Sequence, residues 1–341
     1  MSKITLKELA FQLGLSISTV SKALNDNFEI SESTKNRVKE AASLLNYKPN
    51  LVAKSLKTGY NNTIAIIIPY FGNPFQSQVL EGAHQAAHER NFKLIFMQSR
   101  ENAKLEQESL KSLYEQNVDG VIITPSANSN LKYLRQFLQI CPLVLVDRID
   151  FDLPTFKIGV NSEKGAYDAT QHLINSGRKN ILVLCGMNIG INQKRISGYN
   201  KALMANFIPY NKENIIQVDY GQSREDLIKN LTQILKVKLH QNSEPMGILG
   251  TTDTLTVSCL GILSNLGIKV PDQVSVIGFA NTEAAESLNP SLSTIIQPAF
   301  EIGQKGVEKL IQLIESKDRF KMDFDTTILD TFIVARNSTK V

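Results

Sequence analysis

The first 60 residues alternate short amphipathic segments with polar turns, and this pattern predicts small helices. The first helix has an apolar stripe at the i, i+3, i+4, i+7 spacing of one helical face, formed by Leu6, Leu9, Ala10 and Leu13. Thr5 and Glu8 have the three-residue spacing of a capping box. Gly14 predicts the end of this helix, because glycine adopts the left-handed conformation at little cost.

The same signals predict a second and a third helix. Ser16 can cap the second helix, and Ser31 can cap a third that runs to about Asn46. The apolar positions of these helices are Val20, Ala23 and Leu24, then Val38, Ala41, Ala42 and Leu45. Two short helices joined by a glycine-containing turn are typical of the helix-turn-helix, whose second helix enters the DNA major groove. An ordinary helical hairpin is the alternative. The outward positions of the second helix suit base edges and phosphates: Ile17, Ser18, Ser21 and Lys22.

From residue 63 onward, apolar β-branched runs alternate with amphipathic segments. The first half predicts strands at 63–69, 92–98, 118–124 and 142–147, with helices at about 76–91, 103–116 and 131–139. The second half predicts strands at 180–185, 215–219, 246–251 and 274–279, with helices at about 164–176, 194–206, 224–239 and 253–266. Strands alternating with crossover helices predict parallel doubly wound sheets. Two such halves in tandem are typical of bilobed sugar-binding proteins, which hold their ligand between the lobes.

The charge of the chain is concentrated at its N-terminal end. Residues 1–60 hold nine Lys and Arg against five Asp and Glu, while the remaining residues carry 28 of each sign and no net charge. A basic head on a neutral body suits a nucleic-acid-binding protein, because neutralising phosphates supplies most of the non-specific affinity.

Other features of the composition favour a cytoplasmic protein without a membrane partner. The N-terminus leads into an amphipathic helix with no signal-peptide pattern, and no apolar run has the length of a membrane span. Cys141, Cys185 and Cys259 are far apart, odd in number and set among apolar residues. They are interpreted as buried free thiols, since their spacing fits neither a disulfide framework nor a zinc site.

Enzymatic chemistry finds little support in the sequence, and we expect neither a cofactor nor a bound metal. His84 and His88 lie four residues apart and could chelate a metal, but Gln85 replaces the glutamate of a metalloprotease and no third ligand is evident. We interpret this as a solvated or interface helix face. Nucleotide-binding and serine-hydrolase motifs are absent. The main alternative to a DNA-binding protein is a pure sugar-binding module, with a small-molecule enzyme third.

Five motifs of the N-terminal region, in order, carry a resemblance to a known family: T-L-K-E-L-A, S-x-S-T-V-S-K-A-L-N, S-x-x-T-K-x-R-V, L-N-Y-K-P-N and A-K-S-L. With these motifs the chain resembles the lactose-repressor/galactose-repressor family of bacterial transcription regulators. Matches continue through the body, for example at Asn73-Pro74-Phe75, Val276-Ile277-Gly278-Phe279 and Gln297-Pro298. The resemblance implies a small all-α helix-turn-helix head and an α/β body of two doubly wound parallel-sheet lobes of the periplasmic-binding-protein type.

The resemblance also implies domain boundaries. They are a DNA-binding domain at 1–48, a hinge helix and linker at 49–62, and a bilobed effector-binding and dimerisation domain at 63–341. The chain would cross between the lobes near 161, 292 and 324. The first lobe would comprise about 63–161 and 293–323, and the second about 162–292 and 324–341.

By the same resemblance, the protein would repress transcription as a homodimer on a palindromic DNA operator, under the control of a sugar or sugar derivative. The hinge helix would order on DNA, with Leu56 wedged into the minor groove. Lys22 and Lys54 stand where the family more often has Arg, which weakens bidentate guanine recognition, so the operator sequence does not transfer. The chain ends without an added heptad helix, which favours a dimer. The expected DNA-binding residues are Thr5, Ser16, Ile17, Ser18, Thr19, Ser21, Lys22, Asn25, Ser31, Thr34, Tyr47, Asn50, Ala53, Lys54 and Leu56.

Ligands of open α/β sheets bind beyond the carboxyl ends of the strands. The effector positions that the resemblance places there are Asn73, Phe75, Ser126, Asp147, Arg148, Arg195, Tyr220, Thr252 and Asn281. Each could instead cap or pack, and Asp253 is expected to be a helix N-cap. Ala280 replaces the family's usual acidic residue, and Thr252 an asparagine. A neutral sugar is therefore less secure as the effector, and a phosphorylated, acidic or modified saccharide and a degenerate pocket are alternatives.

Overall fold

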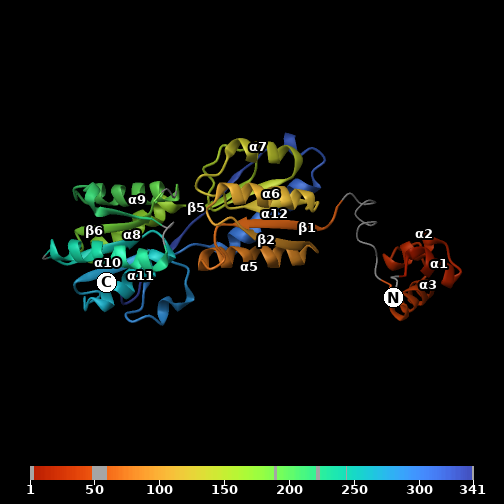
Figure 1. Cartoon of the computed structure of the whole chain (residues 1–341), viewed down its shortest axis with the longest axis horizontal. Helices are drawn as coiled ribbons and strands as arrows, with labels where there is room; N and C mark the ends of the chain where they lie inside the picture. The colour runs from red at the N-terminus through yellow and green to blue at the C-terminus, as the bar shows by residue number, and fades with distance from the viewer. Residues whose placement is uncertain (1–3, 48–59, 188–189, 220–222, 243, 340–341) are drawn as a thin grey trace. The chain divides into compact units, whose positions relative to one another are not determined.

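The computed structural model describes residues 4–47, 60–187, 190–219, 223–242 and 244–339, and the chain divides into two compact units, Met1–Asn61 and Asn62–Val341. The described part of the first unit contains helices, and that of the second contains two sheets flanked by helices (Figure 1).

The first unit is built on the predicted caps. Its helices are α1 (Leu6–Leu13), α2 (Ile17–Leu24) and α3 (Glu32–Leu44). Thr5 and Glu8 form the capping box, Gly14 ends α1 at φ 63°, and Ser16 and Ser31 cap the next two helices, as predicted. The helices enclose one small core, formed by Leu9, Ala10, Val20, Ala23, Val38 and Ala42. Leu45, the C-cap of α3, is 37% exposed and so less buried than predicted.

The second unit contains a first sheet with strand order β11-β5-β4-β3-β1-β2, in which each pair is parallel. These strands are β1 (Thr63–Ile68), β2 (Lys93–Gln98), β3 (Gly120–Ile123), β4 (Leu143–Val146), β5 (Lys157–Val160) and β11 (Thr326–Leu329). The helices of this lobe are α5 (Pro74–Glu89), α6 (Ala103–Glu115), α7 (Leu131–Ile140) and α12 (Ala299–Glu315).

The second sheet has the order β12-β10-β9-β8-β6-β7 and is parallel except for β12, which pairs antiparallel with β10. Its strands are β6 (Asn180–Gly186), β7 (Ile215–Val218), β8 (Met246–Gly250), β9 (Val274–Phe279), β10 (Ser293–Ile296) and β12 (Phe332–Val334). The helices of this lobe are α8 (Ser162–Asn175), α9 (Ile191–Ala205), α10 (Arg224–His240) and α11 (Asp253–Asn265). The prediction of two doubly wound lobes is confirmed.

Each sheet is buried on both faces, which explains why its strands are continuous apolar runs. Ile64, Ile66 and Ile68 of β1 pack toward α5 and α12, whereas Ala65 and Ile67 pack toward α6 and α7. The helices α5 and α12 cross closely where a Cβ on Gly303 would lie 2.0 Å from the carbonyl oxygen of Val79. The three cysteines are buried free thiols, as expected, and burial raises the pKa of Cys185 to about 11.

Two of the predicted lobe crossings lie too early in the chain. The four-residue strand β10 begins at Ser293 but pairs with β9 of the second sheet. The strand β11 begins at Thr326 but pairs with β5 of the first sheet. The chain therefore changes lobe after Ile296 and again after Leu329. The pairing of β10 and β11 determines where the chain changes lobe. A resemblance carried by short motifs contains no information on strand pairing.

Candidate functional site

The helix α2 and its two caps carry seven of the fifteen residues expected to touch DNA: Ser16, Ile17, Ser18, Thr19, Ser21, Lys22 and Asn25. Ile17 is 48% exposed although it is apolar, and Ser18 beside it is also exposed. The Ser16 hydroxyl accepts a hydrogen bond from the Thr19 amide at 3.0 Å, and the two hydroxyls lie 2.8 Å apart. The cap therefore fixes the N-terminal turn of α2 while Ile17 and Ser18 stay accessible.

Other expected DNA-binding residues of the first unit already have partners within the chain. The Lys22 ammonium pairs with the Glu29 carboxylate, and both side chains are nearly half exposed. The Asn25 side-chain amide donates to the Ser21 carbonyl at 2.7 Å. Thr5 caps α1, Ser31 and Thr34 form the cap of α3, and Tyr47 packs against the helical core. Asn50, Ala53, Lys54 and Leu56 lie outside the described residues.

A group of charged side chains lies at the carboxyl edge of the first sheet. Asp147 follows β4 with φ 64°, a conformation that is uncommon for a residue with a side chain. Its Oδ2 accepts from the Gln76 amide at 3.2 Å. Burial raises the pKa of Asp147, and the positive charges of Arg148 and Arg195 act in the opposite direction. Asp147 is therefore a sheltered acidic side chain that interacts electrostatically with an arginine of the second lobe.

Two glutamates that the sequence analysis did not select organise the neighbouring loops. Glu101 forms a bidentate ion pair with Arg148, with Nη1 2.7 Å from Oε2. Glu106 is 1% exposed and accepts from the Ser126 amide at 2.6 Å. Through these contacts the loops after β2, β3 and β4 are held together. Ser126 is fully buried and serves this network, with its hydroxyl donating to Ser99 at 3.2 Å.

At the carboxyl edge of the second sheet, Arg195 is the central residue. It extends from α9, is 4% exposed, and holds its guanidinium 3.7 Å from the centre of the Phe279 ring. It donates to the Thr251 carbonyl and, at 2.9 Å, to Gln297 Oε1. A buried guanidinium stacked on an aromatic ring is held in one orientation.

Three other expected effector residues cap helices or pack in the core. Asn73 caps α5, and Phe75 is 5% exposed within the core of the first lobe. Thr252 caps α11, so the prediction that Asp253 is the N-cap is wrong. Asp253 is the first helical residue, and its carboxylate accepts from the Asn281 amide at 2.7 Å. Tyr220 is outside the described residues.

Contacts between the lobes bring the two edges together. Lys194 of α9 pairs with Asp150 of the first lobe at 2.6 Å. Gln78 of α5 exchanges hydrogen bonds with Asn281, which follows β9. The site residues missed by the sequence analysis are Gln76, Gln78, Glu101, Glu106 and Gln297. Gln297 had a signal, since it belongs to the Gln-Pro motif of the resemblance, but the others look like ordinary helix or turn residues.

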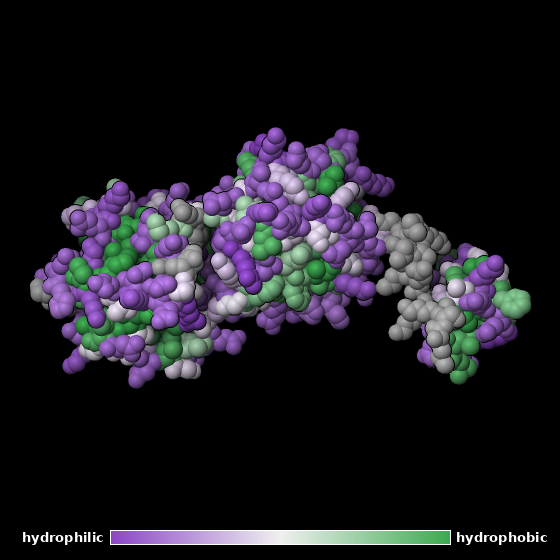
Figure 2. Space-filling model, viewed as in Figure 1, coloured by the Kyte–Doolittle hydropathy of each residue, from purple (hydrophilic) through white to green (hydrophobic). Residues whose placement is uncertain are grey.

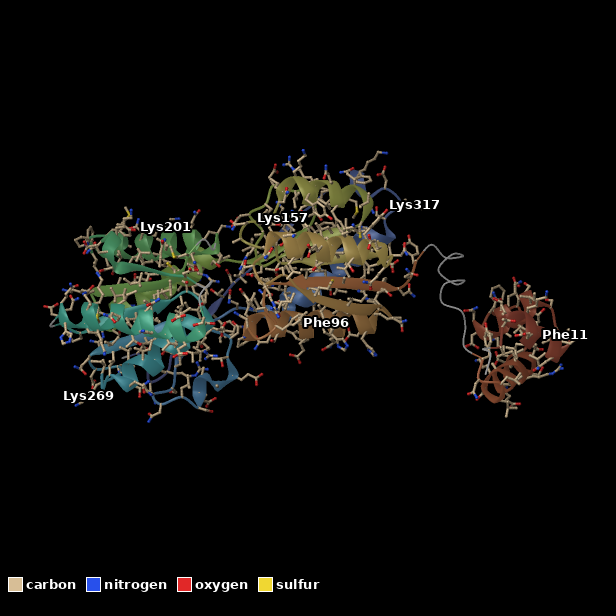
Figure 3. All side chains as sticks on the ribbon, in the orientation of Figure 1. Phe11, Phe96, Lys157, Lys201, Lys269 and Lys317 are labelled. Atoms are coloured by element: carbon tan, nitrogen blue, oxygen red, sulfur yellow. The ribbon has the colours of Figure 1, made fainter. Side chains whose placement is uncertain are left out.

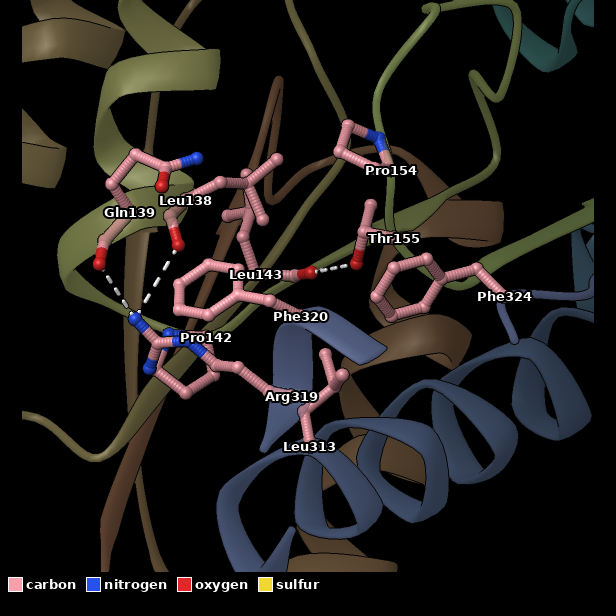
Figure 4. Close-up of a pocket in the computed structure, with 10 residues that line it drawn as sticks. All are labelled: Leu138, Gln139, Pro142, Leu143, Pro154, Thr155, Leu313, Arg319, Phe320 and Phe324. Carbon is pink, nitrogen blue, oxygen red and sulfur yellow. Dashed lines mark hydrogen bonds between the residues drawn. The ribbon is translucent and has the colours of Figure 1, made fainter. Parts of the chain in front are cut away.

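A separate small pocket of about 30 Å³ lies at the other end of the first sheet (Figure 4). Leu143 at the start of β4, Thr155 and Phe320 line it, and Arg319 donates to the carbonyl of Gln139 at 2.9 Å. It includes none of the expected effector residues. The pocket therefore does not lie at the carboxyl edge of the sheet, where ligands of parallel sheets bind.

Within the described part of the chain, no group of three or more His, Cys, Asp or Glu side chains could hold a metal ion. The rings of His84 and His88 stack with their centres 6.5 Å apart. Among the same residues, no helix is both long enough and apolar enough to span a membrane.

Comparisons with known proteins agree with this arrangement. Residues 5–50 match the model of bacterial regulatory proteins of the lacI family, and residues 170–339 match a periplasmic binding protein-like domain. The chain is 30% identical over 338 residues to the HTH-type transcriptional repressor PurR of Vibrio parahaemolyticus, covering 98% of each chain. It is 30% identical over 335 residues to the ribose operon repressor of Haemophilus influenzae, again covering 98% of each.

Solved structures show the same fold. The lac repressor dimer bound to operator and the anti-inducer ONPF superposes with a TM-score of 0.85, at 23% identity and over 100% of both chains. The complex of the transcriptional regulator CelR with cellobiose gives a TM-score of 0.70, at 23% identity over 98% of this chain and 100% of that one. At this identity, the likeness establishes the architecture alone.

Proposed function

Because the chain belongs to the lacI family of bacterial regulatory proteins, we propose that it is a transcription repressor that binds a palindromic operator as a homodimer and responds to a small molecule between its lobes. In this proposal residues 1–48 bind DNA, 49–62 form the hinge and linker, and 63–341 bind effector and dimerise. The observation that carries it is the capped helix α2, which leaves Ile17 and Ser18 exposed at the start of the helix that enters the major groove in such motifs.

The homodimer is supported by an exposed apolar face on the first lobe. Phe96 of β2 is 56% exposed and Phe71 is 39% exposed, with ring centres 6.1 Å apart. Phe96 is labelled in Figure 3, and Figure 2 shows hydrophobic residues reaching the surface on the same side of this lobe. β2 is one of the two edge strands of the first sheet. Exposed aromatic side chains at a sheet edge suit a protein interface. The similar lac repressor was solved as a dimer on its operator.

The effector is proposed to bind where Asp147 and Arg195 approach each other from the two lobes. A sheltered carboxylate and a fixed guanidinium can accept from and donate to the hydroxyl groups of a sugar or sugar derivative. CelR, whose fold is similar, was solved with cellobiose. The alternative is a small-molecule-binding protein that does not regulate DNA, which the same lobes would serve equally well.

Selection from a randomised pool of palindromic duplexes tests the proposal. We expect the full chain to enrich a two-fold symmetric site, and its affinity for that site to fall steeply as salt rises, because phosphate contacts release counterions. A folded protein that enriches no symmetric site, with or without candidate sugars and sugar phosphates, would support the alternative.

A further inference from the structure

The ion pair between Glu101 and Arg148 lies at the ligand edge of the first sheet and is largely sheltered from water. The two side chains are 21% and 14% exposed. Both guanidinium Nη atoms bond to the carboxylate, and Nη1 also donates to the Pro125 carbonyl at 3.1 Å. Glu101 accepts a further bond from the Ala127 amide at 3.1 Å. Arg148 is thus held by a protein carboxylate at the position where an anionic ligand would need it.

The other charged groups near the Glu101–Arg148 pair do not provide a net positive charge for an anionic ligand. Asp147, the buried Glu106 and the buried Asp253 add carboxylates, and Arg195 is the guanidinium that faces them from the second lobe. Arg195 is itself bonded to Thr251 and Gln297. Acidic side chains therefore outnumber guanidiniums here, and burial raises the pKa of Asp147 and of Asp253 among them. A phosphate or carboxylate ligand would meet like charge in a region of low dielectric, where repulsion is strong.

Three buried side chains at the carboxyl edges of the two sheets have oxygens that need a hydrogen-bond donor: Gln76 beside Asp147 at the first edge, and Asn192 and Thr251 beside the ends of β6 and β8 at the second. Gln76 and Asn192 are 5% and 4% exposed, and each uses its amide nitrogen as a donor, to Asp147 and to the Gly186 carbonyl respectively. The side-chain oxygens of both have no hydrogen-bond partner among the residues that the structure describes. The buried Thr251 hydroxyl oxygen likewise has no hydrogen-bond partner among the described residues. Buried oxygens of this kind are costly unless a donor reaches them, and ligand hydroxyls can donate whereas the ionised oxygens of a phosphate only accept.

From this geometry we infer that Glu101 is a specificity-determining residue, which neutralises Arg148 and thereby excludes anionic ligands in favour of an uncharged, hydroxyl-rich effector. The inference rests on the proposed effector site. It restricts the ligands of that site to uncharged saccharides and excludes phosphorylated and acidic ones. Glu101 acts through Arg148 and orients it by two bonds, so its removal changes the charge that the ligand meets as well as the order of the loop.

The test is a calorimetric titration of the full chain with inorganic phosphate. Wild-type protein is expected to bind phosphate weakly or not at all. Glu101→Gln is expected to gain affinity by about tenfold or more, because a charge-assisted arginine–phosphate pair becomes available. The matched control is Glu115→Gln at the far end of α6, where the carboxylate is exposed and pairs loosely with Lys111 at 3.8 Å. This control loses the same charge and should behave as wild type.

Three results would overturn the inference: no gain in Glu101→Gln, an equal gain in Glu115→Gln, or phosphate binding by wild type that Arg148→Met abolishes. Circular dichroism checks folding, and Glu101→Ala serves if the glutamine variant does not fold. A merely structural role for Glu101 would weaken folding without creating phosphate affinity.

Operator binding by the same preparations separates this inference from the proposed function. Protein that binds no operator, but gains phosphate affinity only in Glu101→Gln, contradicts the regulator and supports the role of Glu101. Protein that binds operator and is released by a sugar phosphate, with no effect of the parent sugar, supports the regulator and contradicts the role of Glu101.

Discussion

Gln78 and Asn281 face each other from the two lobes and exchange hydrogen bonds. The Asn281 side-chain amide donates to Gln78 Oε1 at 2.7 Å, and the Gln78 amide donates to the Asn281 carbonyl at 3.1 Å. Asn281 Oδ1 also accepts from the Gln297 amide at 3.1 Å, just after β10 where the chain leaves the second lobe. This interlobe contact is therefore linked through Asn281 to one of the segments that cross between the lobes. Loss of the contact should destabilise the hydrogen bonds of that segment.

Replacing Gln78 with Ala is expected to loosen the contact between the lobes. Two neutral hydrogen bonds, each contributing about 0.5–1.5 kcal/mol, hold this position. Hydrogen exchange measured by mass spectrometry should accelerate by about fivefold or more in peptides that contain Asn281 and Gln297. Gln85→Ala on the same helix is the control, because Gln85 is exposed and bonds only locally, to Glu89 at 2.9 Å. Equal exchange rates in the two variants would show that the hydrogen bonds between Gln78 and Asn281 do not stabilise the contact between the lobes.

Two Gly→Ala substitutions should have opposite effects on stability, one at the crossing of α5 and α12 and one on the open side of α11. Gly303→Ala would place a methyl group 2.0 Å from the Val79 carbonyl oxygen, so the helices must move apart. We expect the free energy of unfolding to fall by about 1–3 kcal/mol. Gly261 in α11 has no neighbouring atom within 4 Å of its ideal Cβ, so Gly261→Ala should raise it by roughly 0.5–1 kcal/mol. Thermal unfolding of both variants checks the pair, and a Gly303→Ala variant as stable as wild type would contradict the close packing.

The sequence predicted features that depend on neighbours in the chain. Thr5 with Glu8, and Gly14 after them, have signals confined to a few residues, and the structure confirms them. The strand runs were predicted for the same reason, since burial on both faces makes them continuously apolar. At Asp253 the local rule admitted two cap residues, Thr252 and Asp253, and the threonine is the cap because the aspartate instead accepts from the distant Asn281 amide.

The candidate site depended on contacts that sequence spacing does not contain. Glu106 stands in a polar helix and looks like a solvated residue, yet it is 1% exposed because it bonds to a loop twenty residues further on. Glu101 likewise meets Arg148 across 47 positions. Phe75 shows the converse, because the family resemblance suggested a ligand contact whereas its side chain fills the core of the first lobe. The burial of each of these three side chains is determined by contacts with residues far away in the sequence.

Glu29 is expected to restrain DNA binding by the proposed helix-turn-helix. Its carboxylate pairs with Lys22, which would otherwise be available to phosphates. Glu29→Gln should tighten operator binding by about twofold to fivefold, the range that an exposed ion pair allows. It should also steepen the dependence on salt by roughly one additional phosphate contact. Anisotropy titrations at two salt concentrations measure both. Glu40→Gln on α3 removes the same charge from an exposed position, and an equal gain in that variant would attribute the effect to net charge alone.

The buried carboxylate of Asp253 predicts a stability difference that depends on pH. Burial raises its pKa to about 6 from an ordinary value of 3.8, although hydrogen bonds from backbone amides and the charge of Arg195 act in the other direction. Between these values the folded state binds more protons than the unfolded chain, so this group lowers the free energy of unfolding as pH rises, and its full cost is present above about pH 6. A shift of about two units corresponds to at most roughly 3 kcal/mol.

Asp253→Asn removes that cost while its Oδ1 can still accept from the Asn281 amide. The variant should therefore be more stable than wild type by about 1–3 kcal/mol at about pH 8, and by under about 1 kcal/mol at about pH 4, where wild-type Asp253 is protonated in the folded state. Urea unfolding at the two pH values measures the difference. Asp323→Asn at an exposed position is the matched control and should stay within about 0.5 kcal/mol of wild type at both. An advantage of Asp253→Asn that grew on acidification would mean that the carboxylate stabilises the fold when it is charged, which is the reverse of what its burial implies.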